Sequence, residues 1–287
     1  MSGLVAGYIP LLDLYFLHLG FAFSQYIVLR AGVFSLATAG FVAIGAYTAG
    51  IFAVKLGLPP VIGLLAGTLT GMGAALFLSI PLARLRGVYQ AIATVAFIQI
   101  VVSLNIYAEG LTGGAMGLNG IPKTIGTFWL FVAAAGATYL IWSIERSRIG
   151  RAFNTIRQDE AVAASLGISI TWHQALAFAI SGALAGLFGG LEAYHAYALD
   201  PNQFGFHLLI TVLSYVILGG RNSVLGPLVG TAILIILPEL ARPLAENRMI
   251  IYGIMLIVVI NYLPKGIADT VLDALRSRRL KAREAPA

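Results

Sequence analysis

Long apolar runs, broken at short intervals by glycine, proline or charged residues, dominate this chain. A helix needs roughly 20 residues to cross a hydrocarbon layer of ~30 Å, and the chain divides into about nine such runs. They cover residues 8–28, 33–55, 58–82, 88–107, 127–144, 173–194, 206–220, 223–240 and 248–263. The pattern predicts an all-α fold: a polytopic integral membrane protein of about eight to ten transmembrane helices, forming a single membrane domain over 1–287.

Composition supports this class. Hydrophobic residues make up 59% of the chain and charged residues 10%, with a mean hydropathy of +0.90, whereas a soluble domain carries about 25% charge. The chain has no cysteine, which excludes a disulfide framework and a thiolate metal site. The N-terminus lacks the basic region and cleavage site of a signal peptide, so the first run is expected to remain as a membrane helix.

The positive charges predict the orientation in the membrane. Of the 18 Lys and Arg residues, fourteen fall on one side of the predicted spans and four on the other. Lys and Arg collect on cytoplasmic loops, so this bias explains the net charge of +6 without nucleic acid. It predicts an external N-terminus, a cytoplasmic loop at 145–172 and a cytoplasmic basic tail at 265–287.

Two stripes of glycine predict close helix packing. In each stripe a glycine recurs every fourth residue, and such spacing lets helix backbones approach where lipid offers no hydrophobic drive. The stripes are Gly63, Gly67 and Gly71 in one span, and Gly182, Gly186 and Gly190 in another.

The predicted span 88–107 carries polar side chains on two faces. Gln90 and Thr94 share one face, and Gln99 and Ser103 lie on the opposite one. Such a helix is expected to be surrounded by protein or to border a translocation path. Interhelical hydrogen bonding is the alternative role for these four side chains.

No catalytic or metal-binding constellation is visible. Residues 117–124 come close to a phosphate-binding loop, but Pro122 stands where the second glycine belongs and offers no N–H to a phosphate. We therefore expect a non-enzymatic chain that binds no ATP, metal or other cofactor. Asp13 and Glu192 lie near the outer ends of their spans, which argues against a proton-coupled secondary carrier with deeply buried carboxylates.

The predicted cytoplasmic loop holds a short helix that cannot span a membrane. Residues 155–166 favour a helix, and Gly167 is a suitable stop. The small residues Ala161, Ala163 and Ala164 are expected on one face, flanked by Arg157, Asp159 and Glu160. Such a face suits docking into a groove of another protein, although a passive connector would have the same composition.

This loop resembles the Glu-Ala-Ala…Gly coupling loop of ABC importer permeases, with Glu160, Ala163, Ala164 and Gly167 in the matching positions. Along nearly its whole length the chain is similar to the branched-chain amino acid (LivM-type) permeases. The matching stretches lie at 45–47, 85–89, 111–118, 150–167, 219–227, 252–253 and 264–266.

The resemblance implies an importer subunit of the inner membrane. Its partners would be two ATP-binding-cassette ATPases that hydrolyse ATP, a second related permease and an external solute-binding protein. The family's Gly-Gln-x-Ser-Leu-Gly turn appears here as 32–37 with Val33 and Ala37 in place of Gln and Gly. The resemblance implies branched-chain or other small amino acids as the cargo, and the departure at 32–37 points to a different substrate if the lost glutamine lines the path. A permease for urea or short amides and, less favoured, an ion-coupled secondary transporter are the alternatives.

Overall fold

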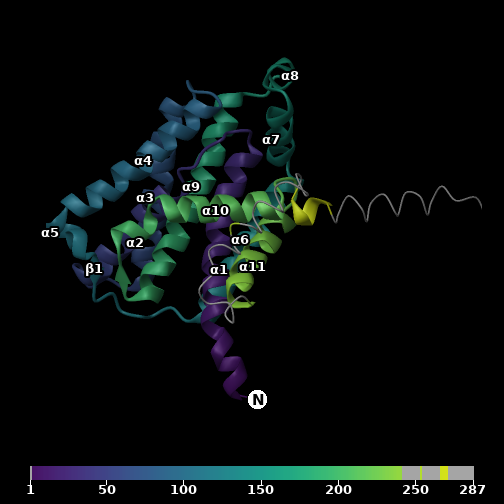
Figure 1. Ribbon diagram of the computed structural model, residues 1–287. Helices are drawn as coiled ribbons and strands as arrows, with labels where there is room; N and C mark the ends of the chain where they lie inside the picture. The colour runs from purple at the N-terminus through teal and green to yellow at the C-terminus, as the bar shows by residue number, and fades with distance from the viewer. Residues whose placement is uncertain (1, 241–252, 254–265, 271–287) are drawn as a thin grey trace, which may run out of the picture. The chain divides into compact units, whose positions relative to one another are not determined.

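The computed structural model describes residues 2–240, 253 and 266–270 (Figure 1). Contacts within the chain divide it into two units, 1–213 and 214–287.

The first unit consists of long helices joined by short connections (Figure 1). Among the described residues, the helices of the first unit with enough length and apolar character to span a membrane are α1 (Ser2–Arg30), α3 (Pro60–Leu82), which has a proline at its first turn, α4 (Val88–Tyr107), α6 (Thr127–Arg146) and α9 (Ile170–Ala196). The shorter apolar helix α2 (Thr38–Val54) is almost entirely buried among them. A sixth stretch of such length and apolar character, Pro201–Gly219, begins in this unit and ends in the second.

Helices α2, α3 and α9 form the centre of the first unit and touch through glycine. A Cβ on Gly186 of α9 would lie 2.3 Å from the carbonyl oxygen of Gly67 on α3, and one on Gly182 would lie 2.4 Å from that of Gly71. Gly45 of α2 completes the contact, because its Cβ would lie 2.4 Å from the Cα of Gly186. The two predicted stripes therefore face one another, with α2 as a third member that the sequence did not indicate.

The seam packs less closely at one of its ends. A Cβ on Gly190 would lie 3.0 Å from a methyl group of Leu64 and 3.3 Å from the Cβ of Ala49. A Cβ on Gly63 would overlap the hydroxyl group of Tyr194, which belongs to a side chain. The closest backbone contacts between the two stripes are therefore those of Gly67 and Gly71 with Gly182 and Gly186.

The connections between helices gather at two opposite ends of the first unit. One, which we call the inner end because the charges predict it to be cytoplasmic, holds 31–37, 83–87 and 147–169, where Arg86 pairs with Glu160 and a Cβ on Gly32 would contact the backbone of Arg157. The outer end holds 55–59, 108–126 and 197–205. Here β1 (Leu118–Asn119) pairs antiparallel with β2 (Ala198–Leu199), and the Lys55 ammonium group donates to the Gly110 carbonyl. This division matches the alternation of sides that the charges predict.

Short helices complete both ends. At the outer end are α5 (Glu109–Thr112) and the 3₁₀ turns η1 (Gly114–Met116) and η2 (Pro201–Phe204). At the inner end are α7 (Arg148–Gln158) and α8 (Glu160–Ser165), which Figure 1 shows one above the other, away from the N-terminal end of α1.

The second unit begins inside α10 (Phe206–Gly219) and continues into α11 (Leu225–Leu240). The turn between them is tight, because a Cβ on Gly219 would lie 1.8 Å from the Gly226 carbonyl oxygen. Asp269 accepts a hydrogen bond of 2.9 Å from the backbone N–H of Asn222, which ties the segment 266–270 to this turn.

The all-α prediction is confirmed for the described residues, whose strands are the two-residue β1 and β2 alone. A helix lies at each of the first eight predicted spans, and the bounds differ by up to six residues. The largest differences are at α1, which begins at Ser2, and at α2, which begins at Thr38. The ninth predicted span, 248–263, and most of the predicted tail 265–287 lie outside the described residues.

Candidate functional site: the inner end and its coupling segment

The predicted docking helix of the 145–172 loop is two helices at an elbow, not one. Asp159 leaves the helical conformation (φ −158°, ψ 115°), so the single helix expected over 155–166 is wrong. Its carboxylate accepts hydrogen bonds from the backbone N–H groups of Ala161 (2.7 Å) and Val162 (3.1 Å). An aspartate satisfies the free N–H groups at a helix start better than it serves within a helix, so the chain restarts here as α8.

The segment ends as its sequence indicates. Gly167 takes the left-handed conformation (φ +75°), and the N–H of Ile168 returns to the carbonyl of Ala163 at 3.0 Å. Gly167 thus closes α8 with the backbone geometry that glycine favours.

The outward face of α8 differs from the expected face. Ala163 is fully buried, whereas Ala161 and Ala164 are exposed. Val162 and Leu166 are exposed beside them, at 49% and 67%. The face that α8 presents is therefore more apolar than the sequence indicated, and Val162 and Leu166 belong to it. Apolar residues on either side of a small residue in a short helix are the sequence signal that would have identified Val162 and Leu166.

Helix α7 is fixed to the membrane helices by its own buried face. The face consists of Ala152, Phe153 and Ile156, and the Phe153 ring meets the His173 ring of α9 edge to face at 6.2 Å. At the other end of α7, the backbone of Arg157 lies against Gly32, in the α1–α2 connection. These contacts hold α7 in place, whereas α8 is held by the buried Ala163 and leaves most of its other residues exposed.

An ion pair between a buried arginine and a half-buried glutamate anchors the start of this segment. Arg30 of α1 lies 3.6 Å (Nε to carboxylate oxygen) from Glu145, at the last turn of α6, and the Tyr26 hydroxyl donates to the same carboxylate. Arg30 and Tyr26 are 8% and 0% exposed. The sequence reasoning missed Glu145, because its partners lie more than a hundred positions away along the chain.

The residues predicted to border a path separate into two groups. Gln90 and Thr94 are buried: Gln90 donates to the Leu82 carbonyl at 3.3 Å, and Thr94 accepts from the N–H of Leu36 at 3.0 Å. Gln99 and Ser103 are exposed on the opposite face of α4. The structure therefore joins Gln90 and Thr94 to the interior and leaves Gln99 and Ser103 on the surface of this chain.

Two cavities border the inner end. One, of about 330 Å³, is lined mainly by apolar side chains of α3 and α9, including Leu82 and Phe178. The other, of about 260 Å³, lies between Arg86, Glu160 and Gln174. Gln90 lines both. The inner end therefore contains two cavities, and the one next to α8 is lined by polar side chains.

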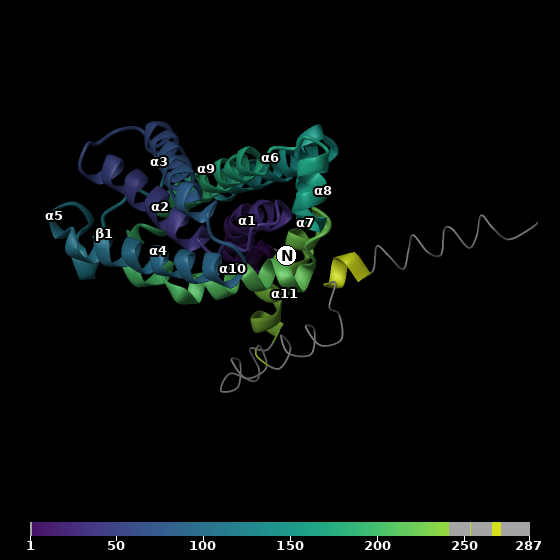
Figure 2. The ribbon, with the colours of Figure 1, turned by 90° about the horizontal axis from the view of Figure 1, so that it is seen from above.

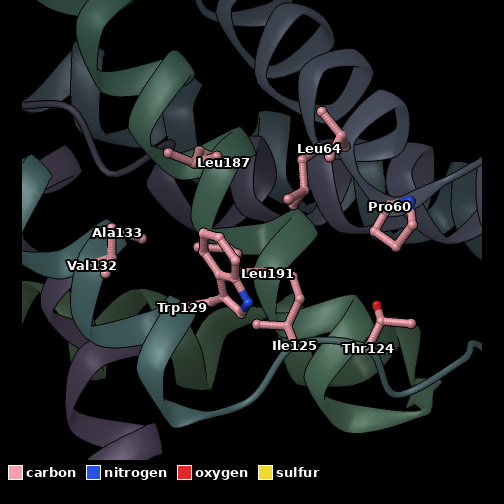
Figure 3. Close-up of a pocket in the computed structure, with 10 residues that line it drawn as sticks. Pro60, Leu64, Thr124, Ile125, Trp129, Val132, Ala133, Leu187 and Leu191 are labelled. Carbon is pink, nitrogen blue, oxygen red and sulfur yellow. The ribbon is translucent and has the colours of Figure 1, made fainter.

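A larger, apolar cavity lies elsewhere in the first unit. Its volume is about 410 Å³, and it lies between α3, α6 and α9 toward the outer end (Figure 3). Trp129, Leu64 and Leu191 point into it, with Thr124 at its edge (Figure 3). Because Trp129 is 60% exposed, this cavity opens on the outside of the first unit, where its lining suits a lipid chain better than a charged solute.

A group of titratable side chains lies close together at the outer end. His195 of α9 is 3.7 Å (Nε2 to carboxylate oxygen) from the buried Asp13 of α1. The second oxygen of Asp13 and one oxygen of Glu192 have no hydrogen-bond partner among the described residues. Groups of His, Cys, Asp and Glu arranged to hold a metal ion are absent from the part of the chain that the structure describes.

Comparison with known proteins decides the family. Residues 12–260 match the family described as branched-chain amino acid transport system / permease component. The chain belongs to this family. It is a multi-pass protein of the inner membrane and an ABC-type permease, and the LivM-type resemblance of its sequence is confirmed.

Individual relatives agree. The chain is 29% identical over 287 aligned positions to the high-affinity branched-chain amino acid transport system permease protein LivM of Salmonella typhimurium, covering 88% of this chain and 68% of the relative. It is 30% identical to LivM of Escherichia coli K12, covering 86% and 66%. It is also 31% identical over 126 positions to the permease protein LivH of that strain, covering 43% and 41%. The chain thus spans about two thirds of the length of the LivM proteins. No solved structure matches it.

Proposed function

We propose that this chain is a permease subunit of an ATP-driven importer of branched-chain amino acids, and that an ATPase subunit docks on α8. Family membership and the branched-chain amino acid transport role of the LivM relatives support the transport role and the cargo. The partners in this proposal are two ATPases that hydrolyse ATP, a second permease of the LivH kind and an external solute-binding protein. The chain itself contributes no cofactor and no catalytic group.

The exposed face of α8 is the observation that carries the docking role. It presents Ala161, Val162, Ala164 and Leu166 at the inner end, in a helix of six residues. Burial of apolar side chains that are exposed to the cytoplasm in a groove of a partner protein lowers the free energy of the complex. The charged groups of Arg157, Asp159 and Glu160 surround this face and would fix the orientation of the partner.

The packing of α7 explains how a docked ATPase would move the membrane helices. Because α7 is packed on α1 and α9, a push on α8 reaches the membrane helices through the elbow at Asp159 and not through a loose loop. ATP binding and hydrolysis on the partner subunits would thereby change the access of the path from one side to the other.

Cross-linking in the assembled importer tests this proposal. The chain has no native cysteine, so Ala164→Cys gives a single thiol at the proposed contact, and Lys123→Cys, at the outer end, is the matched control. Ala164→Cys should cross-link to an ATPase subunit bearing cysteines along its groove, whereas Lys123→Cys should not. Absence of the cross-link from Ala164→Cys in an importer that hydrolyses ATP would refute the contact.

A functional variant accompanies the cross-link. Leu166→Asp puts a charge on the exposed face and touches no spanning helix. It should lower ATP hydrolysis stimulated by the loaded binding protein and uptake together, with normal membrane insertion. Full stimulation would place the coupling contact elsewhere.

A further inference from the structure

Arg86 joins the coupling segment to a different pair of membrane helices from those that hold α7. It lies in the connection 83–87 between α3 and α4, and its guanidinium is 3.2 Å (Nη2 to carboxylate oxygen) from Glu160. Glu160 is the first residue of α8, directly after the Asp159 cap. The ion pair thus bridges two stretches that the sequence singled out separately, 85–89 and 150–167.

The pair is not placed to stabilise the fold. The side chain of Arg86 is 85% exposed and that of Glu160 is 34% exposed, and exposed ion pairs contribute little to stability. A partner protein that covers α8 removes water from the pair and strengthens the attraction between its charges. The contact therefore gains strength in the assembled importer, when the ATPase is docked.

Helix α4 is the element that this contact would move. It packs on α2 and, at the outer end, on η1 and η2, and it takes no part in the glycine seam of α2, α3 and α9. Its first residue follows Gly87, which has a positive φ (+57°), so the turn that carries Arg86 leads directly into it. Helix α4 also presents Gln99 and Ser103 on its exposed face.

We propose that Arg86 is a positioning residue of the importer: through Glu160 it passes the displacement of α8 to α4. This inference rests on the proposed docking of an ATPase at α8. Two connections would then leave the coupling segment, one through α7 to α1 and α9, and one through Arg86 to α4. The second is the one that reaches the polar face of α4.

A charge exchange tests the proposal. Arg86→Glu and Glu160→Arg should each lower the ATP hydrolysis stimulated by loaded binding protein by about fivefold or more. The double variant Arg86→Glu/Glu160→Arg should recover most of it, because the pair is restored with its charges exchanged. Arg84→Glu is the matched control, since Arg84 is exposed in the same turn and forms no ion pair among the described residues. It should behave as the unaltered chain.

A second readout separates transmission from folding. A single cysteine at Ser103 should react with a thiol reagent at different rates in the nucleotide-free and the ATP-bound importer. Arg86→Glu should abolish this difference, and the charge-exchanged pair should restore it.

The outcomes distinguish the two proposals. If Ala164→Cys cross-links to the ATPase and Arg86→Glu retains full stimulation and the full reactivity difference, the role of Arg86 is refuted and docking stands. If the exchanged pair is as impaired as Glu160→Arg alone while Ala164→Cys in that background still cross-links to the ATPase, the role of Arg86 is likewise refuted. If the Ala164→Cys cross-link is absent, the docking proposal itself fails.

Discussion

Arg30 and Glu145 form an ion pair at the inner end, with their charged groups 3.6 Å apart and the arginine almost completely buried. The pair joins the end of α1 to the end of α6, immediately before α7 begins. The membrane helices and the coupling segment therefore share this joint.

The first prediction concerns this pair. Glu145→Gln should lower the free energy of unfolding by about 3–5 kcal/mol, because it leaves the Arg30 charge buried without its partner. Tyr26→Phe should cost about 1–2 kcal/mol, because it removes a single hydrogen bond and leaves the ion pair intact. Thermal unfolding of the purified chain in detergent measures both. Equal loss in the two variants would mean that the ion pair adds nothing beyond the hydrogen bond.

The second prediction concerns the glycine seam. Gly186→Ala should reduce stability and assembly, because even one methyl group would lie 2.3 Å from the Gly67 carbonyl oxygen. Gly73→Ala on α3 is the control, since nothing lies within 4 Å of its added Cβ. Melting temperature and yield of the folded protein are the measurements. A Gly186→Ala protein as stable as Gly73→Ala would show that the helices separate without cost.

The third prediction concerns orientation. Lys123→Cys in intact cells should react with a membrane-impermeant thiol reagent, whereas Ser165→Cys should react only after the membrane is opened. Both positions are exposed and lie at opposite ends of the first unit. Labelling of Ser165→Cys from outside would reverse the orientation that the charges predict.

The fourth prediction concerns α4. Alanine at Gln99 or Ser103 should alter uptake without affecting membrane insertion, because both side chains lie on the exposed polar face. Alanine at Thr94 should instead reduce stability, because its hydroxyl group satisfies the buried N–H of Leu36. Unchanged uptake in both the Gln99 and Ser103 variants would assign the exposed face to lipid or to packing between subunits.

The sequence predicted the long apolar helices of the described chain because each is an apolar run of about the length that spans a membrane. It did not predict the break at Asp159, because helix propensity averaged over 155–166 outweighs a single capping residue. The buried side of α8 was also missed, since the position of Ala163 depends on the angle of the elbow.

Contacts between residues that are far apart in the sequence could not be predicted either. The spacing of Gly67 and Gly186 indicated a packing face on each helix but not that Gly45 would meet Gly186. The pairs Arg30–Glu145 and Arg86–Glu160 join positions more than seventy residues apart. One sequence without aligned relatives carries no sign of such pairs.

The backbone contacts of α2, α3 and α9 limit how this permease changes shape. Side chains at an ordinary helix interface change rotamer when two helices slide, but at this seam carbonyl groups meet Cα atoms and offer no rotamers to change. The three helices are therefore expected to move as one rigid body. Any rearrangement that opens and closes a path has to occur between this body and the helices around it, or between subunits.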